Sequence, residues 1–452
     1  MQNWKEKIEL YKEEYLADLK ELTAMPSVRD LGSAGPGAPF GKGIRQAFDC
    51  FLDIAKRCGF QTEDCGGYAC HAQAGGQKEY IGALGHLDVV GILQPDAWKT
   101  PPFTLSRDGD MLYARGVNDD KGPLLAALYA ARIVMNSGAE LKRSIRIIAG
   151  GAEETTWECM EHYFAEHSQP VMGFSPDGNF PIVNGEKGIL KYELVFREEE
   201  PCRDGGYRLK KISCGTLENY VCSEIAVLAE RQGKKEELSW TGKQSLSRNP
   251  QRGENALWKF AEYFFGKPMD EPEAERLVRF LKECFVGDDY GKRSGLYAED
   301  PEMGSTSVCP TGLCRKEDGL HLYLDIRYPK SVGEDCLNRR IEELASQYGF
   351  HAAVCSRKRL LYVPEDSELI RALKGAYEAV TGERAYVFTK GGASYARTLD
   401  CGVAFGATFE GEETHPHMPD ECMAASSIWR AMEIYCESFW RLAVTCQNLP
   451  QH

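Results

Sequence analysis

Five short clusters of carboxylate and imidazole side chains lie far apart in the sequence and together could supply a two-metal hydrolytic site. Two divalent ions held about 3.5–4 Å apart need one bridging carboxylate and further oxygen or nitrogen ligands on each side. Each cluster alone is too short to be diagnostic, so the prediction depends on their joint occurrence and order. The clusters are residues 85–88 (Gly-His-Leu-Asp), 118–122 (Asn-Asp-Asp-Lys-Gly), 153–154 (Glu-Glu), 176–178 (Pro-Asp-Gly) and 417–421 (His-Met-Pro-Asp-Glu).

The predicted metal ligands form two sets that share Asp119. This residue lies in a turn rich in Asn and Asp and suits the bridge. One ion would take His86 and Asp177, and the other would take Glu154 and His417. We expect two Zn²⁺ ions, with Mn²⁺ or Co²⁺ as alternatives, because imidazole and carboxylate ligands suit such divalent cations.

Two further carboxylates are assigned roles in catalysis. Asp88, two residues beyond His86, can accept the free imidazole N–H and fix the tautomer of a metal-bound histidine. Glu153 stands next to a predicted ligand, so it can remove a proton from an activated water and return it to the leaving amine. Glu153 is therefore the predicted general base.

Each cluster also has a purely structural interpretation. A Glu-Glu pair alone is usually a solvated surface feature, and an Asp-Asp-Lys turn is usually just a loop. His86, between small apolar residues, would more often be a hydrogen-bonded core histidine, and His415 beside Pro416 is typical of a surface loop. Only the combination of all five clusters favours the chemical interpretation.

Apolar runs that alternate between strand and helix patterns precede several of the clusters. Strands alternating with helices imply right-handed crossovers and a largely parallel sheet. His86, Glu154 and Asp177 each follow a short apolar run, which places them at the carboxyl ends of neighbouring strands, where open α/β sheets bind ligands. The expected strands are 80–85, 144–149 and 171–174, and the expected helices are 124–135 and 157–167.

The chain is long enough for two domains, since 452 residues exceed what one hydrophobic core usually fills. Near residue 186 the pattern changes to strands interleaved with helical stretches, and after about residue 364 the earlier style returns. We therefore expect an α/β domain with a mostly parallel central sheet, interrupted by an inserted α+β domain. The expected boundaries are 1–185 and 364–452 for the first domain and 186–363 for the insertion, with an amphipathic helix over 4–24.

Composition excludes several classes of partner. The formal net charge of −14 argues against nucleic acid and anionic membrane as partners. No signal-peptide pattern and no run of 18 apolar residues is present, so we expect a cytoplasmic protein. Seventeen cysteines, an odd number in a long chain, are expected to be mostly reduced. Cys309 and Cys314 are the closest spacing to a zinc knuckle, but no matching second pair accompanies them.

At these residues the chain resembles the aminoacylase/carboxypeptidase-G family of di-zinc peptidases, and within it the bacterial PepV-like dipeptidases. The resemblance implies a catalytic domain split by a lid domain, with a non-proline cis peptide bond after Asp119. It also implies a monomer, because the long lid of PepV-like members mimics a dimer within one chain. The resemblance runs through residues 85–90, 114–123, 152–155, 175–178, 325–329, 391–397 and 417–421.

The lid departs from the family pattern at its usual histidine. The family carries Gly-Lys-Ser-Ala-His there, and the histidine stabilises the oxyanion of the tetrahedral intermediate. In this chain the corresponding position is Leu246, and no histidine occurs between positions 167 and 321. Losing one oxyanion donor typically lowers turnover by about 10²- to 10³-fold. Arg248, Lys243 or Asn249 could substitute.

By the same resemblance, Asn219 and Arg327 would hold the substrate. The Arg327 guanidinium would pair with a terminal carboxylate in its fork geometry. The loop around Asn219 is altered, because the Pro and Asp of the usual Asn-x-Val-Pro-Asp are here Cys222 and Ser223. For Arg327 the alternative is a salt bridge that closes a strand.

These observations predict a metal-dependent hydrolase that cleaves the amide bond of dipeptides through a water activated by two ions, with Glu153 as general base. An N-acyl amino acid deacylase, or another amidohydrolase with the same machinery, is the alternative enzyme. A metal-binding peptide receptor with attenuated catalysis is the alternative from another class, motivated by Leu246. The expected partner is a small peptide or an N-acyl amino acid, without nucleic acid or membrane.

Overall fold

The computed structural model describes residues 2–92, 94–200, 205–214 and 219–446. Contacts divide the chain into two compact units. The first comprises Met1–Gly185, Leu361–Phe388 and Ser394–His452, and the second comprises Glu186–Leu360 and Thr389–Ala393. The inserted domain was expected at 186–363, and the short returning segment was not expected.

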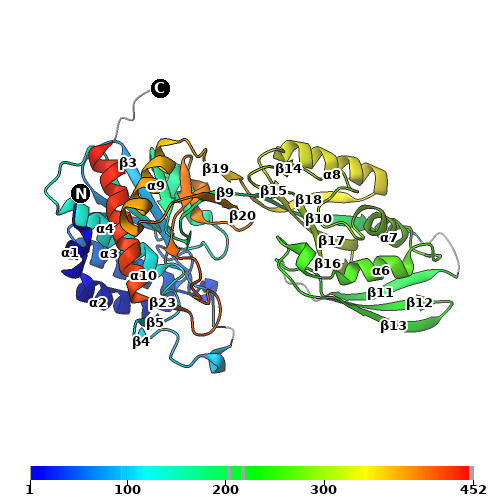
Figure 1. The fold of residues 1–452 in the computed structure, drawn as a ribbon. Coiled ribbons are helices and arrows are strands. Elements are labelled where there is room, and N and C mark those ends of the chain that lie inside the picture. Colours follow the sequence, from blue (N-terminus) through cyan, green and yellow to red (C-terminus); the bar gives the residue numbers. More distant parts are fainter. Residues whose placement is uncertain (1, 93, 201–204, 215–218, 447–452) are drawn as a thin grey trace. The chain divides into compact units, whose positions relative to one another are not determined.

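A mixed sheet forms the centre of the first unit (Figure 1). β6, β3, β7 and β21 run parallel to one another, whereas β1 and β2 pair antiparallel at one edge. This arrangement confirms the predicted α/β fold with a mostly parallel central sheet. The strand order is β1 (Gln61–Cys65), β2 (Ala69–Ala74), β6 (Ser144–Gly150), β3 (Tyr80–His86), β7 (Met172–Ser175), β21 (Gly402–Ala404), β9 (Ile182–Glu186) and β19 (Leu361–Tyr362).

Helices bury the apolar strands of this sheet. α4 is apolar almost all round and nearly every residue of it is buried, as expected for a helix enclosed by protein. α10 packs along α4 (Figure 1). In the described ranges no helix is long and apolar enough to cross a bilayer. The helices of the unit are α1 (Trp4–Glu9), α2 (Lys12–Thr23), α3 (Lys42–Arg57), α4 (Lys121–Met135), α5 (Glu158–Glu166), α9 (Glu368–Thr381) and α10 (Ala425–Phe439).

The N-terminal segment differs from the single helix expected over 4–24. It forms two helices, α1 and α2, with a break at Leu10, whose side chain is 80% exposed. The two helices bury their apolar residues against different partners, because α1 contacts α10 whereas α2 contacts α4 and α3. One straight helix could not pack against α10 and also against α3 and α4.

Two small sheets lie in the loops of the first unit. Each sheet pairs strands that are far apart in sequence. This pairing fixes the positions of the loops that carry several of the predicted ligands. The first contains β4 (Ser106–Asp108), β5 (Met111–Tyr113) and β23 (Cys422–Ala424), and the second contains β8 (Gly178–Asn179) and β22 (Ala407–Thr408).

The second unit has its own core, built from two antiparallel sheets and three helices. In β10 buried residues alternate with partly exposed ones, which is typical of a strand with one face on a core. The α+β character expected for the insertion is confirmed. The sheets are β16 (Ser307–Lys316), β17 (Gly319–Tyr328), β10 (Gly188–Arg197) and β18 (His351–Lys358), and β11 (Tyr207–Cys214), β12 (Glu224–Arg231) and β13 (Lys234–Thr241); the helices are α6 (Ala256–Phe264), α7 (Pro272–Cys284) and α8 (Glu334–Tyr348).

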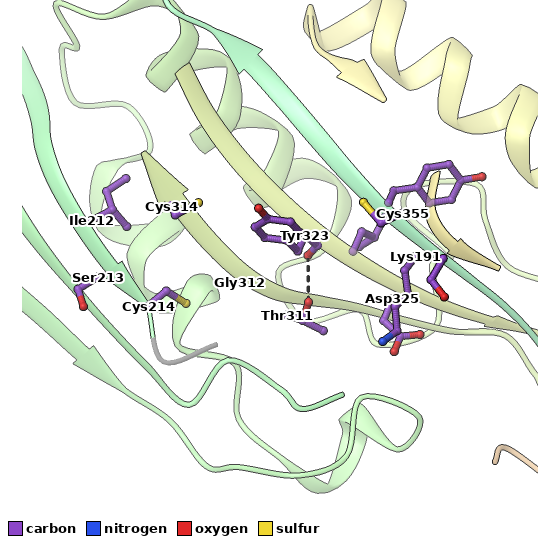
Figure 2. A pocket seen from close by; sticks show the side chains of 13 residues that line it. Lys191, Ile212, Ser213, Cys214, Thr311, Gly312, Cys314, Tyr323, Asp325 and Cys355 are labelled. Carbon is purple, nitrogen blue, oxygen red and sulfur yellow. Dashed lines mark hydrogen bonds between the residues drawn. The ribbon is translucent and has the colours of Figure 1, made fainter. Parts of the chain in front are cut away.

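A cavity of about 550 Å³ lies within this second unit (Figure 2). Its wall combines thiols, such as Cys214 and Cys314, with the polar side chains of Lys191 and Tyr323. The Thr311 hydroxyl donates to the Tyr323 carbonyl at 3.5 Å and joins two of the lining strands, β16 and β17. None of the residues predicted to bind metal lines this cavity.

Candidate metal centre

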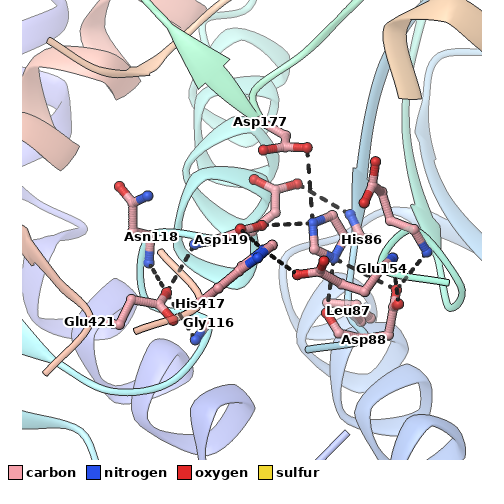
Figure 3. Close-up of polar contacts among 12 residues, drawn as sticks. His86, Leu87, Asp88, Gly116, Asn118, Asp119, Glu154, Asp177, His417 and Glu421 are labelled. Atoms are coloured by element: carbon pink, nitrogen blue, oxygen red, sulfur yellow. Dashed lines mark hydrogen bonds and ion pairs between the residues drawn. The ribbon is translucent and has the colours of Figure 1, made fainter. Parts of the chain in front are cut away.

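The parallel strands of the first unit bring three of the predicted clusters to one edge of the central sheet. His86 is the last residue of β3, Glu154 follows β6, and Asp177 follows β7. β3 pairs in parallel with both β6 and β7, so the carboxyl ends of all three strands meet. Asp119 joins them from the loop before α4, and His417 from the loop before β23 (Figure 3).

Asp119 lies between the two histidines. Its Oδ1 is 2.9 Å from Nε2 of His86, and its Oδ2 is 3.0 Å from Nε2 of His417. Glu154 Oε1 is also 3.0 Å from the His417 nitrogen, and Asp177 Oδ2 is 4.0 Å from the His86 nitrogen. The structure therefore gathers these residues into the two expected sets, with the potential ligand atoms of each set within 4.8 Å of one another.

The donor set fits two divalent cations. Three carboxylates and two imidazoles are ligands that zinc and other borderline divalent ions accept, and Asp119 presents one oxygen to each set. His86 donates its Nδ1–H to the Asp88 carbonyl at 2.8 Å, which leaves the Nε2 lone pair directed toward Asp119. The residues present are thus suitable to hold two ions, one in each set.

The charges in the cluster perturb one another strongly. Hydrogen bonds to Asp119 and Glu154 raise the pKa of His417 to about 11. Burial by itself lowers the pKa of His86. The nearby carboxylates of Asp119, Asp88 and Glu153 have the larger effect and raise this pKa above its ordinary value. Burial likewise favours the neutral acid of Asp119, yet both histidines together hold its pKa well below the ordinary value. The cluster is therefore a region of concentrated negative charge that favours cations.

The contact between Asp88 and His86 differs from the prediction. The Asp88 carboxylate was expected to accept the imidazole N–H, but its Oδ1 is 3.6 Å from Nδ1 and the backbone carbonyl takes that hydrogen bond instead. The two carboxylate oxygens accept the backbone N–H groups of Glu153 and Glu154, each at 3.1 Å. Burial raises the pKa of Asp88 to about 6. Asp88 thus fixes both the histidine and the loop of the predicted general base.

Glu421 is a positioning residue to which the sequence analysis gave no role. Its Oε1 accepts backbone N–H groups from Gly116, Asn118 and Asp119 at 3.0–3.1 Å (Figure 3). Its Oε2 pairs with Arg115 at 2.6 Å. Its side chain is fully buried. The antiparallel pairing of β23 with β5 brings it there. Its place in the same motif as His417 was the available signal.

Asp120 supports the other side of the centre. Its Oδ2 accepts the backbone N–H of His86 at 3.1 Å, and burial raises the pKa of this carboxyl well above its ordinary value. A Cβ atom at Gly85 would lie 2.1 Å from that oxygen, so this position requires glycine. The Asp119–Asp120 peptide bond is cis, as the resemblance implied.

The loop that carries His417 has an unusual backbone. His415, His417 and Asp420 all have positive φ angles, between 52° and 63°, which non-glycine residues rarely adopt. The Asp420 carboxylate stabilises this loop by accepting a hydrogen bond from the Lys99 backbone N–H at 2.8 Å. Such local strain is typical of functional sites held by surrounding structure. Within the described chain, His415 falls in neither group of potential metal ligands.

The predicted substrate-binding residues belong to the second unit, where they share one hydrogen-bonded network. Asp325 pairs with Arg327 through both oxygens, at 2.7 and 2.8 Å, and accepts the Ser247 hydroxyl at 2.7 Å. The Ser247 backbone N–H donates to the Asn219 carbonyl at 2.8 Å. Arg327 is buried in this network, so the salt bridge considered as its alternative role is present.

Leu246 lies in the same segment. It forms an isolated antiparallel bridge with Tyr220, and its carbonyl accepts the Asn249 backbone N–H at 2.8 Å. The exposed Arg248 packs near Gly391, which belongs to the short returning segment of this unit. Leu246, the residue at the lid position where the resemblance implies histidine, therefore directly precedes Ser247. The Asp325 network holds Ser247 in place.

Comparison with known proteins matches most of the chain to one family. The profile of peptidase family M20/M25/M40 matches residues 82–441. The Bacillus subtilis protein YtjP, provisionally named a dipeptidase, is 31% identical over 468 aligned residues, which cover 98% of this chain and 100% of YtjP.

Solved structures share the fold at low sequence identity. Human carnosine dipeptidase 1 aligns with a TM-score of 0.59 and 17% identity, covering 96% of this chain and 97% of that one. The aminoacylhistidine dipeptidase of Vibrio alginolyticus aligns with a TM-score of 0.60 and 14% identity, covering 94% of this chain and 96% of that one.

Proposed function

The chain belongs to peptidase family M20/M25/M40, and from this membership we propose that it is a metal-dependent dipeptidase. The observation that carries the proposal is the position of Asp119, whose two oxygens contact His86 on one side and His417 on the other. Such a carboxylate suits a bridge between two ions. The provisional name of YtjP supports a dipeptide as the substrate.

His86 and Asp177 would hold one ion, Glu154 and His417 the other, and Asp119 both. When bound, two divalent ions would polarise the scissile carbonyl and lower the pKa of an attacking water. Zn²⁺ is the proposed metal, with Mn²⁺ or Co²⁺ as alternatives.

The chain's own residues would move the proton. Glu153 would take it from the attacking water and return it to the leaving amine. The hydrogen bond from its backbone N–H to Asp88 fixes the loop on which it lies, and its carbonyl accepts the Trp157 indole N–H at 2.6 Å. This support on both sides suits a group that must keep one orientation during catalysis.

The second unit would supply substrate contacts. We retain Asn219 and Arg327 as the proposed substrate-binding residues, because both join the network that also anchors the segment around Leu246. Since Asp325 already pairs with two guanidinium nitrogens of Arg327, a terminal carboxylate would have to use the remaining Nη1, whose contact with the Gly391 carbonyl is a long 3.4 Å.

Two other functions stay open to test. The same centre would suit an N-acyl amino acid deacylase, because the hydrolysed bond is the same. The metal-binding peptide receptor is favoured by one observation, namely that Leu246 offers no donor at the position where the family places its oxyanion-stabilising histidine.

The proposal includes a monomer in the cytoplasm. The odd number of cysteines in this long chain supports a reducing compartment. The inserted unit of about 175 residues is long enough to mimic a dimer within one chain, which supports the monomer.

Amide hydrolysis tests the proposal. The purified protein with added Zn²⁺, Mn²⁺ or Co²⁺ would be assayed against dipeptides and N-acyl amino acids, beside Glu153→Gln and, as a matched control, the exposed Glu161→Gln. We expect dipeptide turnover that falls about 10²- to 10⁴-fold in Glu153→Gln with unchanged metal content. Turnover of N-acyl substrates alone would establish the deacylase, and bound metal without any turnover would favour the receptor.

A further inference from the structure

A second cluster of potential metal ligands lies in the first unit, outside the metal centre. Cys65, His71 and His167 place one potential ligand atom each within 4.8 Å of one another. Cys65 and His71 are 3% and 5% exposed, and none of the three contributes to the centre around Asp119. This cluster could not be predicted from the sequence, because 5 and 95 residues separate its members and they follow no recognised spacing.

The β1–β2 hairpin and the end of α5 build this cluster. Glu63 and Cys65 are two residues apart on β1, so their side chains share one face of the hairpin. Glu63 is directly opposite His71 on β2, which places the imidazole on that same face. α5 contacts β2, and His167, the residue after its last turn, completes the group.

Two of the separations in this cluster match the edges of a zinc tetrahedron, and a third is slightly longer. Ligand distances of about 2.0–2.3 Å to zinc give ligand-to-ligand separations of about 3.3–3.6 Å. His167 Nε2 is 3.4 Å from Cys65 Sγ and 3.4 Å from Glu63 Oε1, and His71 Nε2 is 3.7 Å from Glu63 Oε2. The two histidines approach different oxygens of Glu63, so this carboxylate would have to turn to give one oxygen to the ion.

The surrounding contacts permit the tautomer of His71 that a metal site requires. His71 Nδ1 is 3.2 Å from the Tyr163 hydroxyl, which also accepts a hydrogen bond from Arg146 at 3.1 Å. Because Arg146 occupies one lone pair of the Tyr163 oxygen, the other can accept the Nδ1–H of His71. The Nε2 lone pair then points to the Glu63 side, and a partner on the outer nitrogen is the usual arrangement for a metal-bound histidine.

We propose that Cys65, His71, His167 and Glu63 bind one Zn²⁺ ion. A thiolate, two imidazoles and a carboxylate suit zinc, whereas Mg²⁺ and Ca²⁺ prefer oxygen ligands alone. Binding would release the Cys65 thiol proton to solvent as the sulfur–zinc bond forms. The Glu63 side chain is 54% exposed, so the ion has a route of entry from solvent.

The site would act as a structural cross-link. It would join the β1–β2 hairpin to the end of α5, and α5 follows directly on the loop that carries Glu153 and Glu154. The ion would therefore stabilise the first unit at the edge of its sheet. This inference does not depend on the proposed peptidase activity.

Cobalt substitution tests the site with a signal that the metal centre cannot produce. Co²⁺ bound to a thiolate gives a sulfur-to-metal charge-transfer absorption, and the ligand set around Asp119 contains no cysteine. The reduced wild-type protein would be titrated with Co²⁺ beside Cys65→Ser, His167→Asn and, as a matched control from the same helix, His162→Asn. Metal content would be measured on the zinc-loaded proteins, and circular dichroism would check folding.

We expect the absorption in wild type and His162→Asn, its loss in Cys65→Ser, and a weaker signal in His167→Asn. Zinc should displace the signal, and folded Cys65→Ser should hold one zinc ion fewer per chain than wild type. A charge-transfer signal that persists in Cys65→Ser would place the thiolate elsewhere and overturn the proposal. So would the absence of any such signal in wild type saturated with Co²⁺.

Discussion

Arg115 and Glu421 form a buried ion pair, with Nη1 and Oε2 2.6 Å apart and at most 2% of either side chain exposed. The remaining oxygen of Glu421 accepts three backbone N–H groups, those of Gly116, Asn118 and Asp119, in the loop that carries Asp119. The predicted bridging carboxylate is therefore placed by a residue 302 positions later in the chain. The motif around His417 supplies this anchor as well as an expected ligand.

Glu421→Gln should destabilise the first unit and weaken metal binding. The substitution leaves the Arg115 charge buried without its counter-ion, and such a loss typically costs about 3–5 kcal/mol. Chemical unfolding and chelator competition would measure the two effects. The exposed Glu413→Gln in the same loop should leave both near wild type. An unchanged metal affinity in folded Glu421→Gln would contradict the positioning role.

Asp88→Asn should lower metal affinity and turnover together, by about 10- to 100-fold. Asparagine offers one oxygen where two backbone N–H groups need acceptors, so its amide NH₂ would face the N–H of Glu153 or Glu154. Steady-state kinetics with a metal titration would show the change, and Asp96→Asn, at an exposed position, serves as control. Full activity at saturating metal would mean that only metal affinity depends on Asp88.

Removal of divalent ions should abolish turnover and lower the melting temperature. A ligand present at 1,000 times its Kd stabilises the native state by about 4 kcal/mol. Dialysis against a chelator, followed by return of Zn²⁺, Mn²⁺ or Co²⁺ one at a time, would show which ion restores activity. If the chelated protein with no residual metal kept full turnover, the two-metal proposal would be wrong.

Leu246→His should raise kcat by about 10²- to 10³-fold if the natural chain lacks an oxyanion donor at this position. Leu246→Met, which keeps an apolar side chain of similar size, should leave kcat unchanged. No gain in the histidine variant would mean that another side chain already fills the role. Arg248→Ala would then be the next variant to measure, since this exposed residue lies two positions further along the chain.

The carboxylate of Glu193 should make the second unit sensitive to acid. A hydrogen bond from Lys316, with further ones from His321 and Tyr323, lowers the pKa of Glu193 to about 2 from 4.5. A lowered pKa stabilises the fold above pH 4.5, and that stabilisation is lost as the pH falls from 4.5 to 2.

The Glu193 contribution should be about 1 kcal/mol, because the group is partly exposed. Glu193→Gln should therefore lose less unfolding free energy than wild type over this pH range, while the exposed Glu237→Gln should follow wild type. Parallel pH profiles of Glu193→Gln and wild type in urea unfolding would disprove the assignment.

The sequence was sufficient to predict which residues meet at the edge of the sheet, because parallel strands bring their carboxyl ends together wherever they occur in the chain. His86, Glu154 and Asp177 could be placed by that rule alone. The sequence could not show which atom of Asp88 meets the histidine, because carbonyl and carboxylate lie equally close in sequence. Glu421 was missed because most of its partners are backbone N–H groups, which leave no pattern of residue types.

The strand order of the central sheet also constrains how the protein is made. β21 lies between β7 and β9, yet its residues follow the whole inserted unit in the chain. During synthesis β7 and β9 leave the ribosome first. They cannot pair with β21 until Gly402–Ala404 has also been made. The inserted unit, which has its own core, can fold during that interval. Synthesis of the first unit therefore includes a period with unpaired strand edges, when chaperones would be needed most.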